Sequence, residues 1–372
     1  MHKTGTTAIQ DSLEGFCSPS AMYANLWVSS NHSFSFWTAF SEAPHPGLLH
    51  HPTSVNKSPN ELKKIHFDMI EESLKIALKS DKDIIFSGED IANLTPNAIE
   101  SMKNLFNKYT DEIEVISYIR EPDAWMVSAL QENIRHGNYA GYIETSEQPL
   151  YQIKFSKFID IFGVENCLFK EFDLSLFTNS DVVLDFLDVI SVKLSKSTKV
   201  TNISSSTEAI KCIYILNDIY RPEMGIDFLL KARRQFIEFI SDSLPGKFHI
   251  DGSYTRQHLV QSDIEWMEKA SGINFNIKKI SQFNDYKKLL SKLDSKTVAT
   301  LKLYLKKLNF NNDYVSDLDL VFKVFITFID KSYSIKDFSP NKYLELNQDL
   351  VEAKIDPYYH FLVYGIAEKR LY

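Results

Sequence analysis

The fold of this chain is decided by its first thirteen residues, Met1 to Leu13, which read Met-His-Lys-Thr-Gly-Thr-Thr-Ala-Ile-Gln-Asp-Ser-Leu. Gly5 stands between hydroxyl residues, and the apolar residues after it, including Ile9 and Leu13, recur at helical spacing. A glycine lets the backbone approach an anion closely, and the first N–H groups of a helix point at that anion. The pattern therefore predicts a phosphate-binding turn that leads into a helix.

The side chains around Gly5 also suit an anion. Thr6 and Thr7 offer hydroxyl donors, and Lys3 offers a positive charge on a flexible stem. In a Walker A loop the lysine follows the glycine and stands directly before Ser or Thr, whereas here it precedes the glycine. A P-loop kinase or another P-loop nucleotide-dependent transferase is therefore kept only as an alternative, because it would also need a strand-end Asp for Mg²⁺.

A second stretch, residues 115–130, carries another anion-binding pattern. It reads Val-Ile-Ser-Tyr-Ile-Arg-Glu-Pro-Asp-Ala-Trp-Met-Val-Ser-Ala-Leu, and its apolar start predicts a buried strand over 115–119 that ends at Arg120. Ser128 follows Arg120 by eight positions, within a predicted helix. In this order, the two stretches resemble the 5′-phosphosulfate loop and the 3′-phosphate motif of bacterial sulfotransferases that use 3′-phosphoadenosine 5′-phosphosulfate (PAPS). The resemblance covers residues 1 to about 280.

This resemblance implies the PAPS-dependent transfer of a sulfuryl group to an acceptor hydroxyl. Lys3 is then expected at the oxygen that bridges sulfur and phosphorus, and the loop after it at the 5′-phosphate. Arg120 and Ser128 are expected at the 3′-phosphate, which distinguishes this donor from ATP. The resemblance implies no metal. The predicted donor-binding residues are Lys3, Thr4, Gly5, Thr6, Thr7, Arg120 and Ser128.

The general base that would deprotonate the acceptor is expected next to this loop. Residues 84–86, Ile-Ile-Phe, predict a short buried strand that runs into Ser-Gly-Glu-Asp, and Glu89 is the first candidate because it follows a strand end. His2 and His136 are rival candidates. A structural role for Glu89, as a helix-capping or ion-paired carboxylate, stays open. The predicted catalytic residues are therefore Lys3, Glu89 and His2.

Strands and helices alternate through this part of the chain. An amphipathic pattern predicts a helix over 61–79, and Thr95-Pro96 is typical of a helix N-terminus. Such alternation predicts an α/β fold with a doubly wound parallel sheet like that of P-loop NTPases, in which ligands bind at the carboxyl ends of the strands. Further elements are predicted at 151–162 (helix), 166–169 (strand), 180–190 (helix) and 262–266 (a capped helix).

A phosphate loop of this kind normally follows a central strand, yet only two residues precede Lys3. The first strand is thus missing from the predicted sheet, and we expect an apolar stretch encoded upstream to supply it. If that strand were absent, burial worth about 0.8 kcal/mol per methylene would be lost from the centre of the sheet. A catalytically impaired, sulfotransferase-like scaffold in a polysaccharide assembly pathway is therefore the second alternative.

Residues 18–60 are rich in Ser, Asn, His and Pro, with aromatic residues between them. This composition predicts a loop that forms a lid or lines the acceptor side of the site. His45, His50 and His51 lie in this stretch, but their spacing matches no metal-ligand pattern. No metal site is therefore predicted.

The last part of the chain changes character. Residues 284–333 are rich in Lys and Leu and predict a helical connector with a solvated charged face. Residues 334–372 resemble a short helical module appended to bacterial glycosyltransferases and other polysaccharide-related proteins. The pair Asp356-Pro357 would begin its second helix and Gly365 would end it, and its aromatic residues would form a small core of its own. The α/β domain then occupies 1–283, and by analogy the module favours a carbohydrate or glycolipid acceptor.

Composition limits the other functions. The formal net charge of −8 argues against a general nucleic-acid binder. Cys17, Cys167 and Cys212 are too widely spaced for a metal pattern or a disulfide framework, so reduced thiols are predicted. We find no signal peptide and no membrane-spanning run, which predicts a cytoplasmic protein and leaves peripheral membrane contact open.

Overall fold

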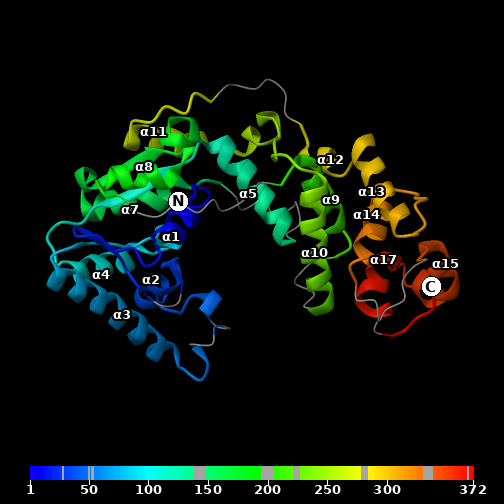
Figure 1. The fold of residues 1–372 in the computed structure, drawn as a ribbon, viewed down its shortest axis with the longest axis horizontal. Helices are drawn as coiled ribbons and strands as arrows, with labels where there is room; N and C mark the ends of the chain where they lie inside the picture. Colours follow the sequence, from blue (N-terminus) through cyan, green and yellow to red (C-terminus); the bar gives the residue numbers. More distant parts are fainter. Residues whose placement is uncertain are drawn as a thin grey trace. The chain divides into compact units, whose positions relative to one another are not determined.

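The computed structural model forms two compact units (Figure 1). The first comprises Met1–Trp125, Pro149–Asn202 and Val260–Ile277, and the second comprises Met126–Gln148, Ile203–Leu259 and Lys278–Tyr372. Each unit is built from three separate segments of the chain, and these segments alternate between the two units. The domains predicted from the sequence, 1–283, 284–333 and 334–372, are consecutive instead, and their boundaries stay a prediction. The described residues are 1–26, 29–48, 51, 54–137, 148–193, 205–220, 227–277, 284–329, 338–366 and 368–372.

The strands of the first unit form two parallel pairs. β1 (Ala21–Tyr23) lies beside β2 (Asp83–Ile85), and β3 (Val115–Ile119) lies beside β4 (Cys167–Glu171). The α/β class and the three predicted strands are confirmed, because parallel pairs need the helical crossovers that separate them. Among the described residues, however, β2 and β3 belong to separate two-stranded sheets. The continuous doubly wound sheet is therefore not seen, since no described strand hydrogen-bonds to both pairs.

Helices connect these strands, and some of them begin at capped positions. α3 (Pro59–Ser80) starts with a capping box at Ser58, and α4 (Pro96–Phe106) starts where the Thr95 side chain accepts a backbone N–H, as predicted. α5 (Pro122–His136) begins in the first unit and continues into the second. The remaining helices of the first unit are α1 (Thr6–Leu13), α2 (Ser33–Phe40), α7 (Tyr151–Phe162), α8 (Val182–Val189) and α11 (Gln261–Ser271).

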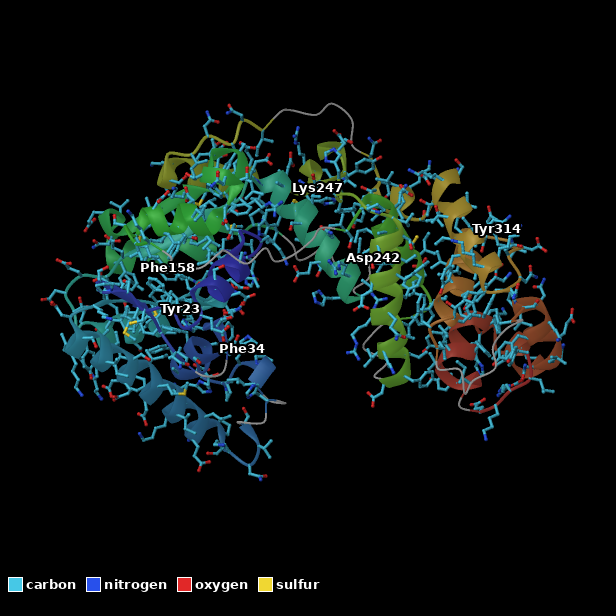
Figure 2. All side chains as sticks on the ribbon, viewed as in Figure 1. Tyr23, Phe34, Phe158, Asp242, Lys247 and Tyr314 are labelled. Carbon is cyan, nitrogen blue, oxygen red and sulfur yellow. The ribbon has the colours of Figure 1, made fainter. Side chains whose placement is uncertain are left out.

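Buried apolar side chains hold the first unit together. Tyr23 of β1 and Phe158 of α7 are both buried in it, and Figure 2 labels them among the other side chains. α1 packs against α8, and its Ile9 and Leu13 side chains are buried there. The apolar helical face predicted from the spacing of these residues is thus confirmed. This packing fixes the start of α1, and with it the loop that precedes the helix.

The stretch 18–60, predicted to be a loop, instead contains β1 and α2. α2 packs against α3 and buries Phe36 together with small hydroxyl residues such as Ser35. Hydroxyl side chains can be buried where they find partners, and Ser35 Oγ lies 3.1 Å from Nδ1 of the buried His66. The loop prediction was wrong because a helix that buries many hydroxyl side chains has an amino-acid composition similar to that of a loop. His50 lies outside the described residues.

Another difference concerns the start of α11. The sequence predicted a capped helix over 262–266, but α11 begins at Gln261 and has no side-chain cap. Asp263 instead accepts hydrogen bonds from the backbone N–H groups of Tyr151 and Gln152, at 2.8 and 2.7 Å. This carboxylate therefore caps α7, a helix distant in sequence, and only the tertiary structure could reveal its partner.

The second unit is helical in its described residues. The segment predicted to be a helical connector contains α12 (Tyr286–Leu290), α13 (Ser295–Lys307) and α14 (Asp317–Ile326), which confirms its helical character. α14 contributes fully buried aromatic side chains to the core of this unit. No helix in the described part of the chain is both long and apolar enough to cross a membrane. The other helices are α9 (Thr207–Leu216), α10 (Asp227–Ser243), α15 (Pro340–Leu346), α16 (Gln348–Glu352), α17 (Pro357–His360) and the π-helical turn η11 (Phe361–Gly365).

The C-terminal residues share the core of the second unit, so the prediction of a separate small core was wrong. The Tyr358 hydroxyl donates to the buried Asp319 of α14 at 3.2 Å. Asp356 caps α17, as predicted. Gly365 does close the last helical turn, but its backbone is not left-handed. A Cβ at this position would overlap the Tyr343 hydroxyl, so glycine is required there by close packing.

Candidate functional site

Residues 1–5 form a loop that contacts the segments following both β2 and β3. His2 Nε2 lies 3.1 Å from Oδ1 of Asp90, which follows β2. Arg120, the residue directly after β3, donates from Nη1 to the Lys3 carbonyl at 2.9 Å. Because ligands of α/β proteins bind where the carboxyl ends of parallel strands gather, this loop marks the candidate site of the first unit.

The loop presents the start of α1. Lys3 and Gly5 have left-handed backbone conformations, with φ of 66° and 71°, and Gly5 is the N-cap of the helix. The Ala8 N–H donates to the Gly5 carbonyl at 3.0 Å, so the N–H groups of Thr6 and Thr7 belong to the first turn. Thr6 is half-buried and Thr7 is exposed. A helix start with leading N–H and hydroxyl groups favours an anion, which is the chemistry that the sequence pattern predicts.

Gly5 is required at its position. A Cβ there would lie 2.8 Å from Val182 Cγ1, and the φ of 71° disfavours any L-residue. Gly15 has nearly the same φ, 70°, but its Cβ would meet no atom within 4 Å. We therefore expect Gly5→Ala to lower the free energy of unfolding by about 2 kcal/mol more than Gly15→Ala, as measured by urea denaturation.

A second variant tests the cause of this difference. Val182→Ala removes the methyl group that the new Cβ would meet, so Gly5→Ala should cost less stability in the Val182→Ala background than in the unaltered chain. Equal losses of unfolding free energy for Gly5→Ala and Gly15→Ala would contradict the packing argument. The effect at both positions would then come only from the positive φ, which disfavours alanine.

Arg120 is fixed beside the loop by three contacts. Its Nη1 donates to the Lys3 carbonyl, its guanidinium carbon lies 5.7 Å from the centroid of the Phe172 ring, and its own carbonyl accepts from the Tyr151 hydroxyl. Burial lowers the pKa of Arg120, but arginine stays charged at physiological pH. A positive charge is thus held in a largely desolvated place, where an anionic ligand would offset the cost of its burial.

Two residues that the sequence analysis did not assign lie at the same loop. Trp125 Nε1 donates to the His2 carbonyl at 3.2 Å, and Lys154 Nζ lies 5.1 Å from the centroid of the Trp125 ring. Trp125 comes from α5 and Lys154 from α7. No local pattern links two residues on different helices, so the sequence carried no signal for this contact.

Three predicted residues stand apart from these contacts. Thr4 is fully buried, and its hydroxyl donates to the Met1 carbonyl at 2.5 Å, so this side chain ties the loop to itself. Ser128 and His136 lie on the part of α5 that belongs to the second unit. His136 is exposed, with Nδ1 3.0 Å from the Glu132 carbonyl. The predicted pairing of Ser128 with Arg120 therefore stays a prediction.

Glu89 lies next to the N-terminal loop, at the start of the short helix η3 (Glu89–Asn93), where Asp90 follows it. Gln10 of α1 donates from Nε2 to Glu89 Oε2 at 3.1 Å, and His2 Nδ1 lies 3.9 Å from Glu89 Oε1. Two of the predicted catalytic residues, His2 and Glu89, are thus neighbours, and His2 directly precedes Lys3. The sequence analysis missed Gln10, although its place one helical turn after Thr6 puts both on one face of α1.

Asp90, which the sequence analysis also left without a role, lies between two histidines. His2 Nε2 and His45 Nε2 lie 3.1 and 3.6 Å from its two carboxylate oxygens. Burial alone would raise the pKa of Asp90, but the hydrogen bond from His2 and the charges of His2 and His45 hold it below its ordinary value. Within the described ranges, no group of three or more His, Cys, Asp and Glu is arranged to hold a metal ion.

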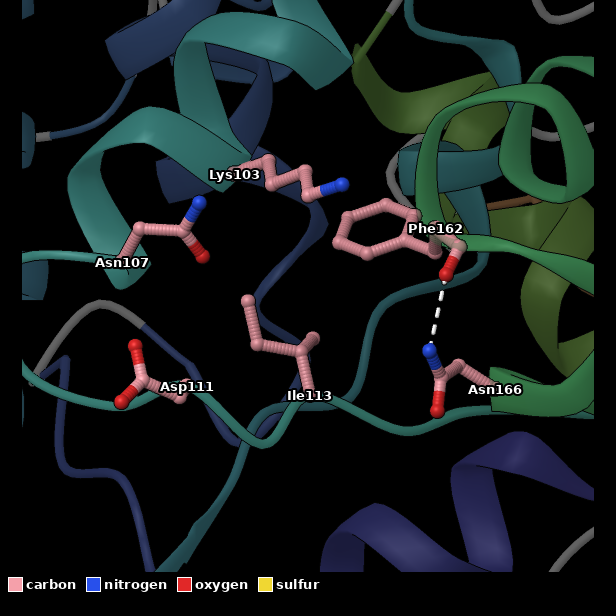
Figure 3. A pocket seen from close by; sticks show the side chains of 6 residues that line it. All are labelled: Lys103, Asn107, Asp111, Ile113, Phe162 and Asn166. Atoms are coloured by element: carbon pink, nitrogen blue, oxygen red, sulfur yellow. Dashed lines mark hydrogen bonds between the residues drawn. The ribbon is translucent and has the colours of Figure 1, made fainter.

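A separate hollow of the first unit lies at the opposite ends of the strands (Figure 3). Asp111 and Ile113 precede β3, and Asn166 precedes β4. Two of its polar side chains bind the end of α7: Asn166 Nδ2 donates to the Phe162 carbonyl at 2.8 Å, and Lys103 Nζ donates to the Ile161 carbonyl. This hollow is therefore explained by helix capping and does not compete with the N-terminal loop as a site.

Comparisons with known proteins add no family assignment. No protein-family model, no curated protein and no solved structure matches this chain.

Proposed function

We propose that this protein is a PAPS-dependent sulfotransferase whose donor binds at residues 1–5. The observation that carries the proposal is the hydrogen bond from Arg120 to the Lys3 carbonyl. It joins, across 117 positions of sequence, the two motifs that resemble the family's 5′-phosphosulfate and 3′-phosphate motifs. A donor with phosphate groups at both ends could then contact both motifs at once, which is what supports the proposal.

The donor side of the proposed reaction needs positive charge and fixed donors. In sulfuryl transfer, negative charge grows on the oxygen that leaves with the 5′-phosphate, much as in phosphoryl transfer. Lys3 would neutralise that oxygen, while the N–H and hydroxyl groups of Thr6 and Thr7 would hold the 5′-phosphate. Arg120 would bind the 3′-phosphate, with Ser128 as its predicted partner.

The acceptor side needs a base. The acceptor oxygen forms a bond to sulfur, the bond between sulfur and the 5′-phosphate oxygen breaks, and the acceptor proton moves to a side chain. Glu89 and His2 are the candidates, because His2 directly precedes Lys3 and its Nδ1 lies 3.9 Å from Glu89 Oε1. A carbohydrate or glycolipid hydroxyl is the proposed acceptor class, and it rests on the resemblance of residues 334–372 alone.

The proposal extends to the fold and the location. β1–β2 and β3–β4 would be the two halves of one P-loop-like, doubly wound sheet, with the N-terminal loop at the point where the strand order reverses. The contacts of this loop with the segments after β2 and β3 support that arrangement. Cys17, Cys167 and Cys212 are free thiols, which supports a reducing, cytoplasmic location.

The test is a titration with adenosine 3′,5′-bisphosphate, the product left by the donor. Arg120→Ala should weaken its binding about 10- to 100-fold, because a charged hydrogen-bond donor is lost, and should weaken adenosine 5′-phosphate less. Arg234→Ala, which removes an exposed arginine of α10, is the matched control and should change neither affinity.

Each contrary outcome favours a stated alternative. If the unaltered chain binds no adenosine 3′,5′-bisphosphate, the proposal fails and the inactive scaffold is favoured. If ATP competes as well as the bisphosphate does, the site does not recognise a 3′-phosphate, and another P-loop nucleotide-dependent transferase is favoured.

A further inference from the structure

The Asp90 carboxylate is held from several directions. Asn93 Nδ2 donates to its Oδ1 at 3.0 Å, and the Asp90 backbone N–H donates to Ser33 Oγ at 3.1 Å at the start of α2. The loop between α2 and η1 (Pro46–Leu48) supplies a third group, His45. A carboxylate held by neighbours from different elements has little freedom to turn, so it can fix the orientation of a further partner.

His45 faces Asp90 with a defined tautomer. The Gly47 N–H donates to His45 Nδ1 at 3.0 Å, so the neutral ring carries its proton on Nε2, the atom that lies 3.6 Å from Asp90 Oδ2. The Phe34 ring packs on the His45 ring with centroids 4.5 Å apart. His45 therefore supports the carboxylate and turns its own lone pair away from the site.

His2 is the group that this carboxylate orients. An ionised carboxylate only accepts hydrogen bonds, so the 3.1 Å contact between Asp90 Oδ1 and His2 Nε2 requires the proton on Nε2. The lone pair of the neutral ring is then on Nδ1, which faces Glu89 Oε1 at 3.9 Å. A hydroxyl that donates to Nδ1 at about 2.8 Å therefore lies beside Glu89, whose Oε1 can accept only from a different donor of the same ligand.

We propose that His2 is the general base, that it acts through Nδ1, and that Asp90 is the positioning residue that holds it in this tautomer. The proposal rests on the proposed sulfotransferase function. The acceptor hydroxyl donates to His2 Nδ1; its oxygen bonds to sulfur while its proton passes to Nδ1. The electron pair of the broken sulfur–oxygen bond leaves with adenosine 3′,5′-bisphosphate. The imidazolium that results is paired with Asp90.

The geometry also gives Glu89 a different task. Its Oε2 accepts a hydrogen bond from Gln10, which fixes the carboxylate against α1. Glu89 Oε1 can then accept a hydrogen bond from a second hydroxyl of the acceptor, which orients the acceptor without taking the reacting proton. This reverses the order of the two candidates given by the sequence, because a strand-end position identifies a carboxylate but cannot reveal how a distant histidine is held.

A spectroscopic test addresses the positioning step without any nucleotide. In the full chain labelled with ¹⁵N-histidine, the His2 ring should show the tautomer with the proton on Nε2, with the assignment made by loss of its signals in His2→Gln. Asp90→Asn should change the tautomer ratio of His2, because an amide can donate as well as accept. Asp68→Asn, which alters an exposed carboxylate of α3, is the matched control and should leave the ratio unchanged.

A kinetic cycle addresses the catalytic step. His2→Gln should lower kcat about 100-fold and leave the affinity for adenosine 3′,5′-bisphosphate within about twofold, and Asp90→Asn should lower kcat at least about tenfold. Because Asp90 acts through His2, adding Asp90→Asn to His2→Gln should cost little more. Glu89→Gln should cost less than His2→Gln.

The outcomes separate this inference from the proposed function. If the unaltered chain binds no adenosine 3′,5′-bisphosphate and transfers no sulfate, the proposed function fails, and the base assignment fails with it. If binding and transfer occur but the His2 tautomer and kcat do not respond to Asp90→Asn, only this inference is overturned. A larger loss of kcat in Glu89→Gln than in His2→Gln would likewise overturn it and return the base to Glu89.

Discussion

Lowering the pH from 7 to 4 is expected to destabilise the first unit by about 6 kcal/mol through two buried histidines. Burial lowers the pKa of both His32 and His66 from 6.5 to about 4. Each lies 1% exposed, so the neutral ring is strongly favoured in the folded state. A shift of this size corresponds to about 3 kcal/mol for each residue.

The sign follows from the direction of the shift. Above pH 6.5 both histidines are neutral in the folded and the unfolded chain, and the unit has its full stability. As the pH falls from 6.5 towards 4, the unfolded chain takes up protons that the folded chain does not, and stability is lost.

The hydrogen bonds of His32 explain why its neutral form is preferred. His32 Nε2 lies 3.0 Å from the Ala24 carbonyl, and Nδ1 accepts from the Ser87 N–H at 3.1 Å. A proton on Nδ1 would point at the Ser87 N–H and break this contact. Ser87 directly precedes the Gly88-Glu89-Asp90 turn, so the strand end that carries Glu89 and Asp90 would lose a support.

Urea denaturation at several pH values measures this effect. Trp37, Trp125 and Trp266 lie within the first unit, so their fluorescence reports its unfolding. Between pH 6.5 and 4, the slope of unfolding free energy against pH measures how many more protons the unfolded chain binds than the folded chain. His32→Gln should lower this number by nearly one, and so should His66→Gln. The control is Ser35→Ala, which removes the partner of His66 but no titrating group and should keep the slope. A slope that neither histidine variant changes would contradict the prediction.

Lys3→Asn is expected to lower kcat for sulfuryl transfer by about 10²- to 10³-fold, the usual effect of removing one group that stabilises the charge of a transition state. Lys3 has a φ of 66°, a conformation that asparagine tolerates better than most residues. The Lys3 carbonyl can therefore keep its hydrogen bond from Arg120 while the ammonium group is lost. The variant separates the charge from the shape of the loop.

Two further variants complete this test. Lys3→Arg keeps the charge and should recover part of the rate, whereas Lys64→Asn removes an exposed lysine of α3 and should have no effect. Lys3→Asn should also change the free energy of unfolding by less than about 1 kcal/mol. If kcat is unaffected in Lys3→Asn, the ammonium group does not act on the leaving oxygen, and the donor model of the loop is wrong.

The sequence by itself determined the local features of this protein. The spacing of Ile9 and Leu13 predicted the buried face of α1, Thr95 predicted the cap of α4, and the apolar run 115–119 predicted β3. Each of these depends on residues within one or two turns or along one strand. Periodicity and capping act over such distances, so the chain reveals them without its fold.

Local composition was a poorer guide where burial reversed its meaning. The stretch 18–60 looked like a loop because it is rich in serine, asparagine and histidine, yet α2 buries several of its hydroxyl side chains. The stretch 262–266 looked like a capped helix, although α11 begins at Gln261 without a side-chain cap and Asp263 caps α7. In both cases the partner of the polar group lies far away in the sequence.

Only the tertiary structure decided how the candidate site is assembled. Arg120 and the Lys3 carbonyl meet because β3 ends beside the N-terminal loop, and Asp90 meets His2 and His45 because three separate segments converge after β2. These contacts depend on the parallel pairing of strands and the packing of helices between them, which no short-range pattern specifies. The sequence therefore identified residues with the right chemistry, but the fold decided which of them lie within hydrogen-bond distance of one another.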